Sequence, residues 1–184
     1  MKYIDQEPWP EPPLAADEAT AVVAALERQR ATLAWKTGGL DAEGLRTTAA
    51  ASAITLGSLL KHMAVLEDDT FTRRIAGRAM VPPWTEVDWD AHPNWDWDSA
   101  ADDDPEELYA LYRDAVARSR AALADVLAEG GLDQPVTSMS DGQGRSPNLR
   151  RVLLDLLEEY ARHSGHADII RESIDGVVGE DRPD

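Results

Sequence analysis

Three side chains able to bind a metal ion lie close together in EEYARHSGHADIIRE, residues 158–172. Glu159 and His163 are four residues apart, and His166 follows three residues later, so on a helix all three would share one face. His62, in SLLKHMAVLE, is a further candidate. Imidazole and carboxylate groups are common ligands of divalent transition metals. This pattern suggests a metal site built on helices.

The neighbours of these residues indicate that the histidines face the protein interior. The stripe that carries Glu159, His163 and His166 has apolar residues at both ends, namely Val152, Leu156 and Ile170. His62 lies three residues after Leu59 and four before Leu66, within a second apolar stripe. A polar group inside an apolar stripe needs a partner, because burial without one is costly.

Each of these features also has an ordinary structural explanation. A single histidine on an apolar face, such as His62, is commonly a hydrogen-bonded core residue. Glu159 and His163 on their own could form a simple intrahelical pair. Metal sites in helical bundles are nevertheless built from side chains on facing helices. The spacing by itself leaves both explanations open.

Four helical segments are expected to position these groups. Apolar periodicity, capping residues and glycine stops place them at about Asp17–Thr37, from Thr55 or Ser58 to Ala76, Asp104–Gly130, and from Ser146-Pro147 to Gly176. One short helical turn is expected after Asp41, and no segment is typical of a strand. The fold class predicted is therefore an all-α four-helix bundle. Residues 1–176 would form a single domain, and residues 177–184 a disordered tail.

A long connection separates the second and third predicted helices. It covers roughly residues 78–103, which is long for an up-down bundle and favours a crossover that leaves the two helices parallel. Four of the six tryptophans lie in its central part, residues 81–100. They could form a lid over the metal site, or they could anchor the crossover by burying large aromatic area. His92, also in this loop, is expected to be exposed.

Composition excludes several classes of function. The net charge of −17 argues against binding to nucleic-acid backbones or anionic membrane surfaces. No apolar run approaches the length of a membrane span, and the N-terminus lacks the apolar core of a secretory signal, so we expect a cytoplasmic protein. There is no cysteine to act as ligand or nucleophile. The basic pairs Arg73-Arg74 and Arg150-Arg151 are expected to pair with acids, with binding of a substrate carboxylate as the alternative.

Several stretches together resemble the DinB-like superfamily of four-helix bundles, in its "mini-circle protein" branch. They lie in the expected order between about Glu27 and Asp175, and they read ERQRATLAWKTGGLDAEGLR, ITLGSLLKHMAVLE, PNWDWD, DPEELYALYRDAVARSR and RRVLLDLLEEYARHSGHADIIRE. Glutamate at position 159 is similar to the mycothiol-dependent maleylpyruvate isomerases. Unlike many relatives, the chain has Asp69-Thr70 before a single aromatic residue, Phe71, near the end of the second helix.

This resemblance implies a divalent metal held by His62, Glu159 and His163. Zn²⁺ is the first choice, and Ni²⁺, Fe²⁺ or Mn²⁺ would also suit two imidazoles and a carboxylate. His166 falls beside the implied ligands, where it would hydrogen-bond a ligand or carry a proton as the candidate catalytic residue.

The implied activity is that of a metal-dependent transferase or isomerase that uses a low-molecular-weight thiol. The expected partners are a small-molecule substrate and a small thiol, and the protein would be a monomer or a homodimer. The alternatives are a non-catalytic metal- or ligand-binding protein and a metal-dependent hydrolase.

Overall fold

Capping side chains begin the long helices of the computed structural model, which describes residues 9–179 and 182. α1 spans Glu18–Thr37, and the carboxylate of Asp17 accepts a hydrogen bond from a backbone N–H in its first turn. α5 spans Pro105–Gly130 after the cap Asp104, with the proline at its first position. Both starts agree with the sequence-based prediction, because capping is a local interaction.

The second predicted helix is confirmed, although it changes its hydrogen-bonding pattern. α3 spans Leu56–Glu67, and Thr55 and Ser58 cap each other's backbone groups. From Glu67 the chain continues as a π-helical segment, η1 (Asp68–Ile75). Such widened turns are frequent at functional sites.

The fourth predicted helix begins later than expected. α6 spans Leu149–Asp175 after the cap Asn148, whereas the sequence suggested a start at Ser146-Pro147. The Pro147 carbonyl instead accepts a hydrogen bond from the backbone N–H of Val136, which holds residues 147–148 in an extended conformation. The predicted stop is confirmed, since Gly176 takes the left-handed conformation that ends many helices.

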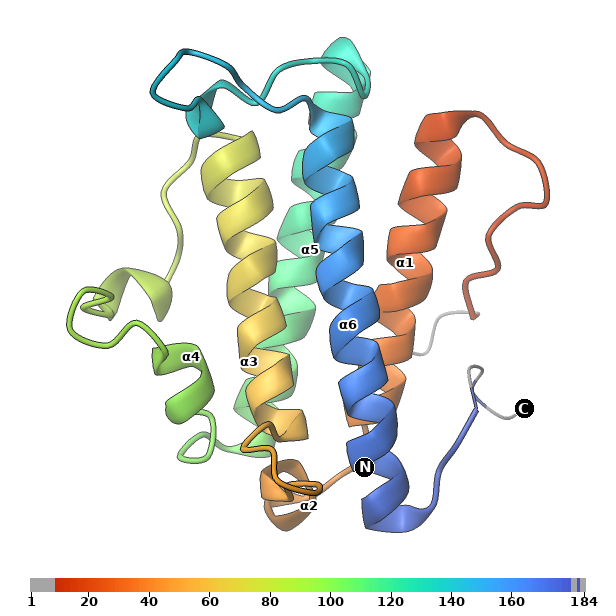
Figure 1. Ribbon diagram of the computed structural model, residues 1–184, viewed down its shortest axis with the longest axis vertical. Coiled ribbons are helices and arrows are strands. Elements are labelled where there is room, and N and C mark those ends of the chain that lie inside the picture. The colour runs from red at the N-terminus through yellow and green to blue at the C-terminus, as the bar shows by residue number, and fades with distance from the viewer. Residues whose placement is uncertain (1–8, 180–181, 183–184) are drawn as a thin grey trace.

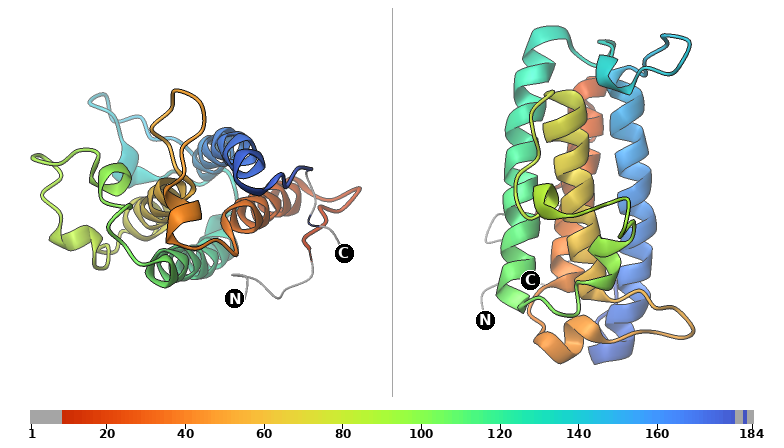
Figure 2. Two further views of the ribbon diagram at one scale, coloured as in Figure 1. Left: turned by 90° about the horizontal axis from the view of Figure 1, so that it is seen from below. Right: turned by 90° about the vertical axis from the view of Figure 1, so that its left-hand side faces the viewer.

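The long helices form the predicted all-α bundle, with α1 packed mainly on α6 and α3 mainly on α5. Figure 1 shows α3 and α5 running in one direction and α1 and α6 in the other. The segment between η1 and α5 crosses back along the outside of the bundle, as Figure 2 shows in its right-hand view. The predicted crossover is therefore confirmed.

Shorter helical elements complete the described chain. They are α2 (Ala42–Arg46), η2 (Trp84–Glu86), α4 (Trp95–Asp98) and η3 (Thr137–Met139). Within the described residues, none of the helices has both the length and the apolar character that crossing a membrane requires. Residues 1–8 and part of the predicted tail, residues 180, 181, 183 and 184, lie outside the described residues. The disordered tail and the single domain stay predictions.

One buried polar network connects all four long helices. Glu67 of α3 has no exposure to solvent and accepts two hydrogen bonds from the guanidinium of Arg30 of α1, at 2.8 and 2.6 Å. Tyr160 of α6 donates its hydroxyl to the same carboxylate, and Tyr112 of α5 lies 3.0 Å from the Tyr160 hydroxyl. Burial and the nearby carboxylate raise the pKa of Tyr160, so its hydroxyl keeps its proton.

We expect Glu67→Gln to destabilise the bundle by about 3 kcal/mol, because the buried Arg30 would lose its fully buried carboxylate partner and keep only the partly exposed Glu27, 2.6 Å away. The matched control is Asp114→Asn, which breaks an exposed pair with Arg113 and should cost less than about 0.5 kcal/mol. Urea unfolding followed by circular dichroism measures both changes. Equal effects of the two variants would contradict a structural role for the network.

Candidate metal centre

The packing of α3 and α6 brings the three predicted metal ligands together. One ligand atom each from His62, Glu159 and His163 lies within 4.8 Å of the other two. His62 comes from α3, whereas Glu159 and His163 are one turn apart on α6. The side chains of His62 and His163 are 16% and 7% exposed, and that of Glu159 is 37% exposed. The cluster therefore lies near the surface, with its carboxylate on the open side.

Hydrogen bonds indicate which ring nitrogens are available to a metal. Nδ1 of His62 lies 2.7 Å from a carboxylate oxygen of Asp96, which leaves its Nε2 for another partner. Nε2 of His163 lies 3.3 Å from the Glu159 carboxylate. The Nδ1 atom of His163 lies 3.3 Å from Nδ1 of His166. Each of the two imidazoles thus has its Nδ1 held by a side chain outside the cluster, which leaves its Nε2 for coordination; Nε2 of His163 faces Glu159, the third proposed ligand.

The protonation state of His163 also suits a ligand. Burial, together with repulsion from the neighbouring His62, lowers the pKa of His163 to about 4. The ring is therefore neutral near pH 7, which is the form that binds metals.

The residues present fit a divalent metal ion. Two neutral imidazoles and one carboxylate are a donor set suited to Zn²⁺ and to its first-row neighbours. Ligand atoms about 2.0–2.2 Å from one ion lie about 4 Å or less apart, so small side-chain movements would close this cluster around a metal. Three protein ligands leave a coordination position open, as in catalytic rather than structural zinc sites.

The structure places His166 beside a proposed ligand rather than among the three. It lies one turn after His163, its side chain is half-buried, and the Nδ1 contact described above is its link to the cluster. One of the two Nδ1 atoms must donate and the other accept. When His163 coordinates through Nε2, its Nδ1–H is the donor and His166 the acceptor. Its catalytic role stays a prediction.

Asp96 is a candidate functional residue that the sequence analysis missed. It belongs to the four-residue helix α4 in the crossover, and it is only 5% exposed. Its carboxylate holds Nδ1 of His62, an arrangement that orients metal-binding histidines in many proteins. In the sequence Asp96 is one of many acids in an acidic loop. Its position between Trp95 and Trp97 was the one available signal of burial.

The tryptophans of the crossover both anchor the loop and reach the site. Trp84 is 2% exposed and donates its indole N–H to the buried Asp68 at 2.8 Å, which supports the anchoring interpretation. Trp97 stacks on the ring of His62 with a centroid separation of 4.1 Å. Part of the loop therefore forms a wall of the candidate site. His92 is exposed, as predicted.

The basic pairs form ion pairs, as the sequence analysis expected. Arg150 contacts Glu18 and Asp133, and Arg151 contacts Asp155. Arg73 and Arg74 both contact one carboxylate, that of Asp69.

Comparison with protein families gives a match over most of the chain. The sequence model of the family described as mycothiol-S-transferase matches residues 21–176, which is most of the chain. The search of curated proteins finds no match.

We expect wild-type protein purified without a nickel column to contain close to one divalent metal per chain. His62→Ala and His163→Ala should each bring the metal content near zero, because two ligands hold a divalent ion poorly. His92→Ala is the matched control, since its ring is exposed in the crossover. Elemental analysis measures all four proteins. Equal metal contents throughout would contradict the assigned ligands.

We also expect Asp96→Ala to raise the dissociation constant for Zn²⁺ by about 10- to 100-fold, the usual effect of losing a carboxylate that orients a ligand histidine. Asp96→Asn should lose less, because the amide oxygen can still accept the Nδ1–H. Competition with a chromophoric chelator measures both. Asp98→Ala, which removes an exposed acid two residues away, is the control. The orienting role would be wrong if Asp96→Ala and Asp98→Ala bound zinc equally well.

Proposed function

The chain belongs to the mycothiol-S-transferase family of DinB-like proteins, and from this premise we propose that it is a metal-dependent S-transferase. The reaction would join the sulfur of a small thiol, with mycothiol as the first choice, to an electrophilic carbon of a second substrate. The S–H bond breaks as the sulfur–carbon bond forms. In a substitution, the leaving group departs from that carbon with its bonding electron pair and the thiol proton passes to solvent. In an addition to an unsaturated carbon, the π bond opens and the neighbouring atom takes up the proton. The single observation that carries the proposal is the cluster of His62, Glu159 and His163 within a matched family.

The three clustered residues would hold the metal. A divalent ion bound there would supply Lewis acidity that lowers the pKa of a thiol at its open position, which makes a thiolate available near neutral pH. His62 would bind through Nε2 while Asp96 holds the proton on its Nδ1. His163 would bind through its Nε2 and donate its Nδ1–H to His166. Asp96 and His166 thus orient the two imidazoles.

A polar groove beside the cluster suits the body of a polar thiol. The groove has a volume of about 340 Å³ and lies between the α3–η1 segment and α6, with Glu159 in its wall. Most of its other lining residues are polar or charged, among them Thr70, Arg74, Arg151 and Glu158. These groups can exchange hydrogen bonds with hydroxyl and amide groups. A thiol seated there has its polar body next to the proposed metal ligands.

Trp97 would limit the access of water to the other side of the cluster. Its ring stacks on His62 and also lies 5.6 Å from the His163 ring, measured between centroids. The two histidine rings are themselves 5.0 Å apart. Aromatic surface packed around the imidazoles lowers the local dielectric and strengthens the interactions of charged groups with their ligands.

We expect metal-loaded protein to accelerate the conjugation of mycothiol with a chromogenic aryl halide, and His163→Ala to reduce the rate to that of the uncatalysed reaction. His166→Gln should keep most of the metal and lose about tenfold in rate, because its contribution is to the orientation of His163. His92→Gln serves as the control. Rates are followed by absorbance, with the metal content of each sample measured in parallel.

Two outcomes would overturn the transferase proposal. A metal-loaded protein that gives no thiol-dependent rate with a panel of electrophiles would be a non-catalytic metal-binding protein. A protein that cleaves esters without added thiol, and has no thiol-dependent rate, would be a metal-dependent hydrolase.

The same variants test the ligand set. If His166→Gln loses metal as completely as His163→Ala, the ligand set is wrong and Glu159 is the residue to replace in it.

A further inference from the structure

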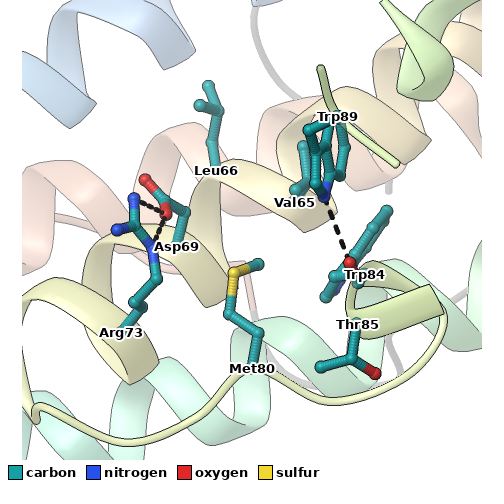
Figure 3. Close-up of a pocket in the computed structure, with 8 residues that line it drawn as sticks. All are labelled: Val65, Leu66, Asp69, Arg73, Met80, Trp84, Thr85 and Trp89. Carbon is teal, nitrogen blue, oxygen red and sulfur yellow. Dashed lines mark hydrogen bonds and ion pairs between the residues drawn. The ribbon is translucent and has the colours of Figure 1, made fainter. Parts of the chain in front are cut away.

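A second cavity lies on the other side of α3 from the polar groove, under the crossover. Its volume is about 490 Å³, and Figure 3 shows the side chains that line it. They come from α3 and η1 on one side and from the crossover on the other, and they are Val65, Leu66, Asp69, Arg73, Met80, Trp84, Thr85 and Trp89. Nothing in the proposed metal site uses this cavity.

Most of the cavity wall is apolar, and the two indoles offer it only hydrocarbon surface. The N–H of Trp84 is used by Asp68, and the N–H of Trp89 donates to the Trp84 carbonyl at 3.1 Å. Neither indole therefore has a hydrogen-bond donor left for a ligand. Aliphatic and thioether groups form the remaining apolar wall, with Met80 adaptable in shape. Such a surface favours a flat apolar molecule.

The opposite end of the cavity carries an ion pair whose carboxylate is shared with a second arginine. Figure 3 shows Arg73 and Asp69 there, away from the two tryptophans. The Asp69 carboxylate pairs with Arg73 through one oxygen and with Arg74 through the other, the latter at 2.6 Å. Two guanidinium groups thus share one carboxylate, so Asp69 does not serve Arg73 alone. Arg74 itself lines the polar groove, together with Asp155, Glu158 and Glu159. Arg73 is 54% exposed, so its remaining N–H groups can reach a ligand.

We propose that this cavity binds a small molecule with a flat apolar body and one carboxylate. The apolar body would lie against the indole faces, and the carboxylate would pair with Arg73. Guanidinium groups suit this role because they can bind a carboxylate with two parallel hydrogen bonds.

The place of the cavity makes this molecule the acceptor of the sulfur, a further step that rests on the proposed transferase function. Val65 and Leu66 lie one helical turn after His62 on α3. Leu66 and Asp69 line both this cavity and the polar groove that contains Glu159. The two binding regions therefore adjoin at the side chains of Leu66 and Asp69, and a displacement of the Leu66 side chain would let the sulfur reach the acceptor. The acceptor would be an aromatic or unsaturated carboxylic acid with its electrophilic carbon toward α3.

The binding claim is tested by isothermal titration calorimetry with 2-naphthoate and its uncharged analogue 2-naphthalenemethanol. We expect one site for each, with naphthoate bound about three- to fivefold more tightly, the usual range for a partly exposed ion pair. Met80→Trp, which fills the cavity, should weaken both ligands more than tenfold while the circular-dichroism spectrum stays unchanged. If neither ligand binds to the wild type, or if Met80→Trp binds both normally, the cavity is not the site.

Two charge variants should change the preference for naphthoate in opposite directions. They therefore test whether Asp69 is shared by the two arginines. Arg73→Gln leaves one guanidinium for one carboxylate and should remove the preference for naphthoate without changing the affinity for the alcohol. Asp69→Asn frees both guanidinium groups and should increase that preference. Arg113→Gln makes the same charge change at an exposed site on α5 and is the control. A preference for naphthoate that is the same in all of these variants would overturn the assigned carboxylate partner.

The acceptor assignment has its own test. In the conjugation assay, 2-naphthoate should inhibit competitively against the electrophile in the wild type and lose this effect in Met80→Trp. Binding by calorimetry without inhibition would overturn the acceptor assignment and leave the cavity as a separate binding site. Calorimetry needs no turnover. If the protein has no transferase activity, the proposed function is wrong, but calorimetry still tests binding in the cavity.

Discussion

A carboxylate buried without water must be neutralised by the chain itself, and the arrangement of this bundle depends on how Glu67 meets that requirement. Arg30 supplies the charge from α1, and hydroxyl groups complete the network from Tyr160 on α6 and Tyr112 on α5. Apolar packing tolerates small sliding of one helix along another, whereas a two-point guanidinium–carboxylate contact does not. This contact therefore fixes α3 against α1, and the hydrogen bond from Tyr160 to the same carboxylate fixes the level at which α6 faces α3. His62 precedes Glu67 by five residues and His163 follows Tyr160 by three, so the same register brings the two imidazoles together.

The crossover is attached at two places, one at the start of η1 and one on α3, and each attachment has a consequence for binding. At the first, Trp84 closes over Asp68, whose charge is balanced by Arg118 of α5 at 2.7 Å. This contact holds the loop over the apolar cavity. At the second, the buried Lys61 hydrogen-bonds Ser99, and the adjacent His62 meets Asp96. The loop is therefore both anchored and part of the binding sites. The contacts that hold it in place also build walls of the apolar cavity and of the candidate metal centre.

Local signals account for what could be predicted from the sequence. Caps such as Asp17 and Asp104 act on the turn that follows them, so the helix starts and the bundle class follow from short-range patterns. The pair of Glu159 and His163 is equally local, since helical spacing alone puts the two on one face. His62 joins them in the structure, in agreement with the family resemblance, whereas its periodicity alone had favoured a hydrogen-bonded core histidine. The late start of α6 was missed because a backbone contact between Val136 and Pro147 decides it.

The residues that sequence reasoning missed are those whose role depends on contacts between distant segments. Asp96 lies 34 positions from His62, and in the sequence it resembles any other acid of the crossover. The apolar cavity is likewise formed only when residues 80–89 fold back over α3. Asp69 is a further example, because the numbers of acidic and basic residues in a sequence do not show that one carboxylate pairs with two arginines. That sharing leaves Arg73 only partly neutralised at the rim of the cavity, within a strongly acidic protein. The charge that a ligand meets thus depends on which acidic and basic groups lie at the binding site, and the net charge of the chain says little about it.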